Sequence, residues 1–344
     1  YNHVNRTVMY GFFNRHFELG FEEPVLESDF ELLSKEQLTV WNQQHPAPSG
    51  SDVGDLHETS LLGLMTDDTD SRMAALTPRS ADDLQPFREV VGSAWQTILD
   101  RRLPQVGAVK FSDTREISHG RYTLTLGRLN HTRAGEQLPA MTLRSPQNTQ
   151  QGIIVWLTES GKAGLLTADS VIPPVAKLLQ QGYTILSADL SGQGEFLANN
   201  DQPDAQRMWY QRNGDKGWER FSGYTYGYNH SLFVQRTHDT LSLIRYAGSI
   251  AGAHSTHLVG LGRTVGPVAL AARSQAGDAV DATVVDVNGF QFQSITQQAD
   301  PMFVSGAVKY LGVDGLLSVC APHDVSVAGM SEAAVARRVF AAAG

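Results

Sequence analysis

The stretch STHLVGLGRTVGPVALAA, residues 255–272, decides the fold. Its first half contains the short apolar run of residues 257–260, which indicates a buried strand. Its second half is rich in Ala and Val and indicates a helix, and a turn of small residues joins the two. Strand, tight turn and helix in this order form a nucleophile elbow, in which the motif G-x-S-x-G holds a catalytic serine on a strained corner.

The nucleophile position of this elbow is occupied by glycine. When Gly260 is aligned with the first glycine of the motif, Gly262 takes the place of the nucleophile and Thr264 the last small position. Glycine has no side chain that could attack a substrate. We expect Gly262 at a sharp strand-to-helix corner with a positive φ, because glycine adopts this conformation without steric cost. The pattern indicates a serine-hydrolase module that has lost its serine.

Composition limits the classes of function. The chain has 344 residues, of which 41% are hydrophobic, so it can form one large domain with extra material or two smaller domains. A net charge of −9 argues against a nucleic-acid partner, and no apolar run is long enough to predict a membrane span. The single cysteine, Cys320, has no partner for an internal disulfide.

Two patterns that could suggest a ligand fail on their spacing, so we expect neither a cofactor nor a metal. Gly260, Gly262 and Gly266 do not fit G-x-G-x-x-G, because the last glycine comes one residue too late. The acidic cluster TDDTDSR, residues 66–72, lacks the spacing of a calcium loop and is interpreted as a solvated turn.

From residue 151 onward, buried strands alternate with helices, which predicts a parallel sheet covered on both faces. Before residue 151, three half-exposed patterns predict an antiparallel edge. The expected antiparallel strands are residues 106–111, 122–129 and 138–144. The expected parallel strands are residues 152–157, 183–188, 257–260, 282–287 and 324–329, and the expected helices are 4–19, 87–99, 168–181, 231–246, 265–272 and 331–342.

Four further segments carry a family resemblance. They are ESGK at residues 159–162, SADLSGQGE at 187–195, GYTYGYN at 223–229 leading into QRTHD at 235–239, and CAPH at 320–323. With the elbow, they make residues 86–344 similar to an α/β-hydrolase domain, and in particular to the second half of tandem proteins of the acetylxylan-esterase type. The resemblance implies an α/β-hydrolase-like fold: a mostly parallel sheet with helices on both faces and an antiparallel edge.

The same resemblance implies a domain organisation. Residues 1–22 would be the C-terminal helix of an upstream hydrolase domain, residues 23–85 a connector, and residues 86–344 a degenerate hydrolase domain. The upstream domain of the same protein would carry the working serine, acid and histidine. Large apolar residues at helical spacing in the first segment would need a partner surface. These residues are Val4, Val8, Phe12, Phe13 and Phe17.

A complete catalytic triad is not expected in this chain. The acid position of the family corresponds most nearly to Glu332 or Asn288, and the strand that normally precedes the histidine would lie beyond Gly344. Ser160, at the end of the first parallel strand, is a candidate for an unusual nucleophile, although this loop more often supplies backbone N–H groups to an oxyanion. Because a triad needs three groups in hydrogen-bond reach, we assign no catalytic residue and keep Ser160 and Glu332 only as candidates.

Several polar and aromatic residues favour structural roles. His323 and Asp324 are adjacent on an extended segment and therefore point to opposite faces. Arg236 and Asp239 are spaced for an ion pair on a helix surface, next to His238. Asp189 follows the end of a strand, and the family resemblance implies a structural role for the turn that it begins. An aromatic-rich stretch suits core packing or sugar stacking and comprises Trp209, Trp218, Tyr224, Tyr226 and Tyr228.

The resemblance implies the C-terminal pseudo-hydrolase part of a larger serine carboxylesterase, an acetyl (xylan) esterase that acts on polysaccharide. One alternative is a non-catalytic structural, dimerisation or carbohydrate-binding module. Another is an active hydrolase with a displaced nucleophile such as Ser160 or Thr264. The implied partners are the upstream domain, a polysaccharide and a second copy of the chain. The family suggests a secreted or periplasmic protein.

Overall fold

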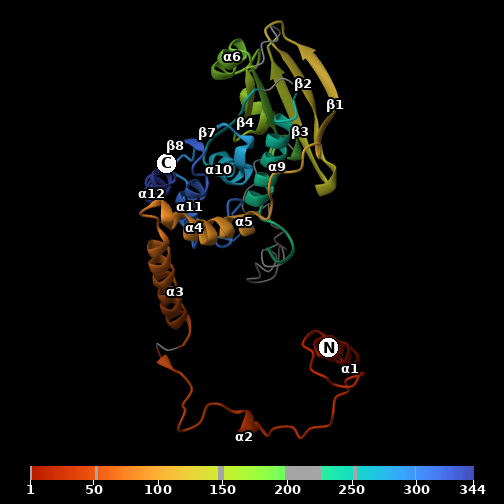
Figure 1. The fold of residues 1–344 in the computed structure, drawn as a ribbon, viewed down its shortest axis with the longest axis vertical. Coiled ribbons are helices and arrows are strands. Elements are labelled where there is room, and N and C mark those ends of the chain that lie inside the picture. The colour runs from red at the N-terminus through yellow and green to blue at the C-terminus, as the bar shows by residue number, and fades with distance from the viewer. Residues whose placement is uncertain (1, 51–52, 146–150, 198–225, 251–253, 299) are drawn as a thin grey trace, which may run out of the picture. The chain divides into compact units, whose positions relative to one another are not determined.

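A computed structural model describes residues 2–50, 53–145, 151–197, 226–250, 254–298 and 300–344 (Figure 1). The chain divides into two compact units, Tyr1–Leu64 and Met65–Gly344. Each unit is described by itself. Among the described residues, no helix combines the length and the apolar character needed to cross a bilayer.

The first unit contains α1 (His3–His16) and α2 (Lys35–Leu38). α1 begins at Asn2, whose side chain accepts a hydrogen bond from Asn5 N at 3.2 Å. The helix predicted over residues 4–19 is therefore present, but it ends at His16. Its apolar residues are open to solvent, with exposed fractions from 38% to 68% for Val4, Val8, Phe12, Phe13 and Phe17.

A long helix, α3 (Asp55–Leu76), includes the acidic cluster that the sequence had suggested to be a turn. That prediction is wrong. Asp, Thr and Ser have weak helix propensity, which favoured a turn, but the Leu- and Ala-rich segments on both sides favour helix. Arg72 also pairs with Asp68 one turn earlier, with Nε and Oδ2 2.9 Å apart, and such a pair supports a helix.

The second unit is built on one eight-stranded sheet in the order β1-β2-β3-β5-β4-β6-β7-β8 (Figure 1). β1, β2 and β3 pair antiparallel, β3 pairs antiparallel with β5, and the remaining neighbours are parallel. The predicted mostly parallel sheet with an antiparallel edge is confirmed. The strands are β1 (Val109–Ser118), β2 (Thr123–His131), β3 (Glu136–Arg144), β4 (Gly152–Leu157), β5 (Tyr183–Ala188), β6 (Thr256–Leu261), β7 (Ala282–Asp286) and β8 (Asp324–Ala328).

Both faces of the sheet are buried, and β4 shows how. Its alternate residues belong to two separate cores, because successive side chains of a strand point to opposite faces. Ile153, Val155 and Leu157 pack in the core that contains α9 (Leu232–Ala247) and α10 (Val265–Ala276). Ile154 and Trp156 pack in the core that contains α6 (Pro173–Gln180).

Three further helical regions complete the larger core. The helix expected over residues 87–99 is present as α4 (Leu84–Phe87), a π-helical segment (Arg88–Gly92) and α5 (Ser93–Leu99). α12 (Ala334–Ala343) begins three residues later than expected. α11 (Gly312–Val319) was not predicted, because its two glycines and its short apolar run give no clear helical period.

The topology brings the loops after β4, β5, β6 and β7 to one edge of the sheet, because parallel strands end on the same side. We refer to it as the carboxyl edge. The elbow between β6 and α10 lies there, and so do the turns that follow β4 and β5.

Candidate active site

The elbow has the predicted shape. Gly262 lies between β6 and α10 with a φ of 143°, so the expected positive φ is confirmed. Its N–H donates to Asp286 O at 2.9 Å, and its carbonyl accepts from Gly266 N at 2.9 Å. A Cβ on Gly266 would lie 2.2 Å from Asp286 O, so this glycine lets α10 approach β7 closely. The glycines of the turn therefore serve close packing.

The space beside Gly262 is filled by the carboxylate of Glu159, from the loop after β4. A Cβ built on Gly262 would lie 2.3 Å from Glu159 Oε1 and 2.8 Å from its Cγ. The same carboxylate accepts a hydrogen bond from Thr264 N at 2.7 Å and another from the Thr264 hydroxyl. Thr264 is the N-cap of α10, where the helix dipole favours a negative charge. Glu159 thus occupies the volume that a nucleophile side chain would need.

Neighbouring groups hold Glu159 in this position. Gln193 is 2% exposed, and its side-chain amide donates to the carbonyls of Thr158 and Glu159, both at 3.2 Å. Arg236, on α9, is 4% exposed and interacts electrostatically with Glu159. Burial lowers the pKa of Arg236 to about 10, and the charges of Glu159 and Asp239 partly oppose this shift, so the guanidinium remains cationic at neutral pH.

The turn after β5 encloses a second carboxylate, that of Asp189, which is 1% exposed. It accepts hydrogen bonds from Lys162 N at 2.9 Å and Glu195 N at 3.0 Å, and it forms an ion pair with the Lys162 ammonium. A Cβ on Gly161 or Gly194 would lie within 2.3 Å of this carboxylate. Asp189 therefore fixes the loop after β4 to the turn after β5, which is the architectural role expected for it.

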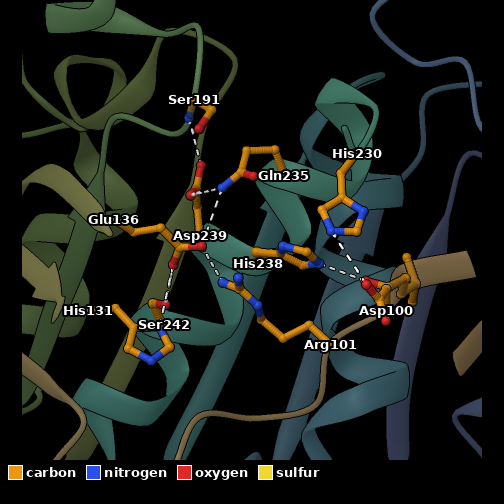
Figure 2. A network of polar contacts seen from close by, with 11 residues as sticks. Asp100, Arg101, His131, Glu136, Ser191, His230, Gln235, His238, Asp239 and Ser242 are labelled. Atoms are coloured by element: carbon orange, nitrogen blue, oxygen red, sulfur yellow. Dashed lines mark hydrogen bonds and ion pairs between the residues drawn. The ribbon is translucent and has the colours of Figure 1, made fainter. Parts of the chain in front are cut away.

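A third carboxylate, that of Asp239, belongs to a network of polar side chains around α9 (Figure 2). The Asp239 carboxylate accepts a hydrogen bond from Ser191 N at 2.7 Å and one from the Gln235 amide at 3.4 Å. The Gln235 amide also donates to Glu136 Oε1 at 3.5 Å, and Glu136 forms an ion pair with Arg101. Burial raises the pKa of Asp239 to about 6. This network ties α9 to β3 and to the turn after β5.

Comparison with solved structures decides the fold. A Bacteroides fragilis protein assigned as an acetyl xylan esterase superimposes with a TM-score of 0.59 at 12% identity, over 80% of this chain and 78% of that chain. The chain has an α/β-hydrolase-like fold. No protein-family model matches the sequence, and a search of curated proteins finds no relative.

Other structures similar to this hydrolase fold superimpose less well. Acetyl Xylan Esterase 1 from Thermoanaerobacterium gives a TM-score of 0.47 at 13% identity, over 71% of this chain and 81% of that chain. A promiscuous CE15 esterase from a marine bacterial metagenome gives 0.48 at 10% identity, over 73% and 79% of the two chains. At 12% identity, the comparison with the Bacteroides fragilis protein concerns the fold alone.

The catalytic candidates named from the sequence do not come together as a triad in the structure. Ser160 is exposed beside Glu159, and no hydrogen bond links its hydroxyl to a described residue. Glu332 is exposed just before α12 and has no polar partner among the described residues. Asn288 follows β7 with a φ of 44°, and its N–H donates to Asp286 Oδ1 at 2.8 Å. The structure brings none of these three together with a histidine.

The two histidines that the sequence singled out bond to other parts of the hydrolase fold or lie on its other edge. His323 directly precedes β8, so it lies at the amino edge, opposite the elbow. His238 is 1% exposed, and its Nε2 lies 2.6 Å from Leu99 O. Burial lowers the pKa of His238 to about 4, so its ring is neutral and donates from Nε2. Within the described residues, no histidine bonds to Gly262, Thr264 or Glu159.

One structural prediction on α9 is wrong in its details. Arg236 and Asp239 do not form a helix-surface ion pair, because both side chains are buried, at 4% and 0% exposure. The guanidinium instead donates to Ser191 O at 2.9 Å and Gly192 O at 3.4 Å. The large apolar residues beside them on α9 turn this face of the helix into the core, which the pair spacing alone does not reveal.

The aromatic stretch divides between packing and exposure. Tyr226 packs on Phe303, with ring centroids 5.1 Å apart, and its hydroxyl donates to Gln298 O at 2.7 Å. Tyr228 is 84% exposed. Trp209, Trp218 and Tyr224 lie outside the described residues. Within the part of the chain that is described, no three His, Cys, Asp or Glu side chains gather as a metal site.

Glu159 is the site residue that sequence reasoning missed. The motif ESGK was expected to supply an oxyanion loop, and Ser160 drew attention as the only hydroxyl in it. One feature of the sequence could have drawn attention to Glu159: it is a carboxylate that closely follows the strand at residues 152–157. In the folded sheet this strand, β4, pairs with the elbow strand β6. Its contact with Thr264 joins residues 105 positions apart, so only the fold reveals it.

Proposed function

We propose that this chain is the C-terminal pseudo-hydrolase part of a larger serine carboxylesterase that acts on acetylated polysaccharide such as xylan. The hydrolase fold would serve as a scaffold for an upstream catalytic domain. The carrying observation is the pair formed by Gly262 and Glu159. The elbow has its shape but no nucleophile, and a carboxylate takes the nucleophile's space.

The chemistry of the elbow supports this proposal. An ester hydrolase needs a nucleophile, a base within hydrogen-bond reach and donors for the oxyanion. At the elbow, residue 262 has no side chain, and no described histidine bonds to Gly262, Thr264 or Glu159. A negative carboxylate beside the helix N-terminus would also repel the developing oxyanion of a bound ester.

The exposed apolar side of α1 supports an upstream partner. Val4, Val8 and Phe17 are each at least 66% exposed, and a stripe of this kind is stabilised when another surface covers it. We propose that residues 1–22 form the end of an upstream hydrolase domain, that residues 23–85 connect it, and that residues 86–344 form the degenerate domain. A second copy of the chain is the alternative partner.

A fluorophosphonate probe tests the proposal directly. We expect no labelling of the full chain, while an active serine esterase in the same assay is labelled. Hydrolysis of p-nitrophenyl acetate should stay at a residual level, on the order of a millionfold below an intact triad enzyme. Labelling that disappears in Ser160→Ala would contradict the pseudo-hydrolase proposal.

One observation favours a second candidate function, a hydrolase with a displaced nucleophile. The Thr264 hydroxyl donates to the Glu159 carboxylate, and a hydroxyl beside a base is the first half of a nucleophilic pair. If this pair were catalytic, Thr264→Ala and Glu159→Gln would each abolish the p-nitrophenyl acetate activity, whereas Ser160→Ala would leave it unchanged. We expect instead that all four proteins show the same residual rate.

A further inference from the structure

A groove of about 460 Å³ lies against the antiparallel part of the sheet, apart from the elbow. Its walls come from β1, β2 and β3, which lie side by side in Figure 1, and from the turns after β4 and β5. The residues that matter for its chemistry are Asp113, Arg115, Arg128, Lys162, Glu195 and Phe196. It combines strong charges with one aromatic ring.

A β-bulge shapes the wall formed by β1. The register of β1 against β2 shifts between Ser112 and Arg115, and Asp113 has a φ of 52°. Gly127, opposite on β2, makes room for the bulge, since a Cβ there would lie 2.7 Å from Ser112 O and 2.9 Å from the Phe111 ring. Bulges redirect side chains and recur beside binding sites. The sequence of β2 thus accommodates the irregular wall.

The charges of the groove leave one cation without a counter-charge. Arg128 faces Asp113, with Nε and Oδ2 3.8 Å apart, and the Lys162 ammonium pairs with both Asp189 and Glu195. Arg115 is exposed, and its guanidinium forms no hydrogen bond or ion pair with any described residue. On a chain whose net charge is −9, this open positive charge favours an anionic group at this place.

Phe196 supplies the second recognition element. The ring is 46% exposed and lines the same groove as Arg115. A flat apolar ring beside a few fixed polar groups is a typical lining for a small ligand, and the C–H face of a sugar packs well on it. The planar guanidinium matches the two oxygens of a carboxylate or sulfate.

We propose that this groove binds an anionic saccharide, with Arg115 pairing with its carboxylate or sulfate and Phe196 contacting the sugar ring. The inference rests on the proposed function, because that function brings the chain to a polysaccharide. It adds the charge class of the saccharide and a place for it away from the elbow. The groove would hold the acidic part of a polymer chain while chemistry takes place elsewhere.

Isothermal titration of the full chain with three probes tests this inference. Trigalacturonate carries carboxylates, a sulfated galactose trisaccharide carries sulfates, and xylotriose is neutral. We expect at least one of the two anionic probes to bind, and the neutral probe to bind at least about tenfold more weakly. Binding should weaken when salt is added, because Arg115 is open to solvent.

Variants locate the site. Arg115→Gln and Phe196→Ala should each weaken the anionic probe by about tenfold or more, whereas the matched control Arg121→Gln, an exposed arginine outside the groove, should leave affinity unchanged. Absence of binding, equal binding of xylotriose, equal binding by Arg115→Gln, or full competition by inorganic sulfate at the same concentration would each overturn the inference. The readout is binding alone, so fluorophosphonate labelling of the chain would contradict the proposed function without altering this result.

Discussion

The turn after β5 and the turn after β6 each enclose a carboxylate at the carboxyl edge of the sheet, but to different degrees. Asp189 is 1% exposed and receives two backbone N–H groups and an ammonium from two separate loops. Glu159 is partly exposed, and among the described residues its carboxylate accepts hydrogen bonds from Thr264 alone. Asp189 is part of the frame of the hydrolase fold, whereas Glu159 fills a space that remains because residue 262 has no side chain.

Asp189→Ala should lower the free energy of unfolding more than the other variants, because Asp189 joins the loop after β4 to the turn after β5. The variant leaves two N–H groups unpaired and leaves Lys162 with only Glu195 as a counter-charge. We expect the free energy of unfolding to fall by about 3–5 kcal/mol in urea titrations. Asp169→Ala, at an exposed position, should change it by less than about 0.5 kcal/mol. A loss below about 1 kcal/mol for Asp189→Ala would remove the distinction between the two carboxylates.

Gly262→Ser should cost about 2–4 kcal/mol, because it combines an unfavourable φ with a clash against Glu159. Glu159→Ala removes the clash, so the same substitution should be less costly in that background. The test is a double-mutant cycle of unfolding free energies. Additive effects, within about 0.5 kcal/mol, would show that Glu159 does not fill the nucleophile's space.

Neither serine variant should gain activity. Gly262→Ser and the double variant Gly262→Ser/Glu159→Ala both lack a histidine beside the new hydroxyl, so p-nitrophenyl acetate hydrolysis should stay at the level of the parent chain. Turnover in either variant would mean that a base and an acid reach the elbow from positions not identified in the described residues.

Asp239 is a further carboxylate for this comparison: it is fully buried, and no cation among the described residues forms an ion pair with it. Its folded pKa of about 6 lies above its ordinary value of 3.8, so ionisation opposes folding. The stability contributed by the protonated form is present below about pH 4 and is lost as the pH rises to about 6. Asp239→Asn does not ionise and should be more stable than the parent above pH 6, by about 1–3 kcal/mol.

Thermal unfolding from pH 4 to pH 8 measures this difference. The gap between Asp239→Asn and the parent should widen as the pH rises and become constant above about pH 6. His238→Gln serves as the matched control, because burial lowers the pKa of His238 to about 4 and its effect has the opposite sign. A gap that is independent of pH would show that Asp239 does not titrate in this range.

Glu159→Gln should change the free energy of unfolding the least of these variants. Glutamine keeps an oxygen that accepts from Thr264 N but loses the charge at the start of α10. We expect a loss of about 0.5 kcal/mol at low ionic strength, most of which disappears in 1 M salt. A loss that salt does not change would show that the hydrogen bonds, rather than the charge, hold Glu159 in place.

Much of the fold follows from local patterns, but the contacts of its polar residues do not. The run at residues 152–157 coincides with β4, because a strand buried on both faces is continuously apolar. The run at residues 183–188 coincides with β5, although the buried Thr184 and Ser187 interrupt its apolar sequence. Gly262 was placed correctly because a tight strand-to-helix turn restricts φ. In contrast, the contacts of Glu159, Arg236 and Asp239 depend on loops brought together only by folding. The helix over residues 66–72 was missed because its support comes from its flanks.

The burial of β4 has a consequence for how the molecule opens. All six residues of this strand are buried, and it lies between β5 and β6 in the middle of the sheet. β8, in contrast, is the last strand of the sheet and is partly exposed along its length. We therefore expect amide hydrogens to exchange with solvent earlier at β8, and at β1 on the other edge of the sheet, than at β4 and β6. The elbow and the loop that carries Glu159 extend from β6 and β4, so both are anchored on the strands that we expect to open last.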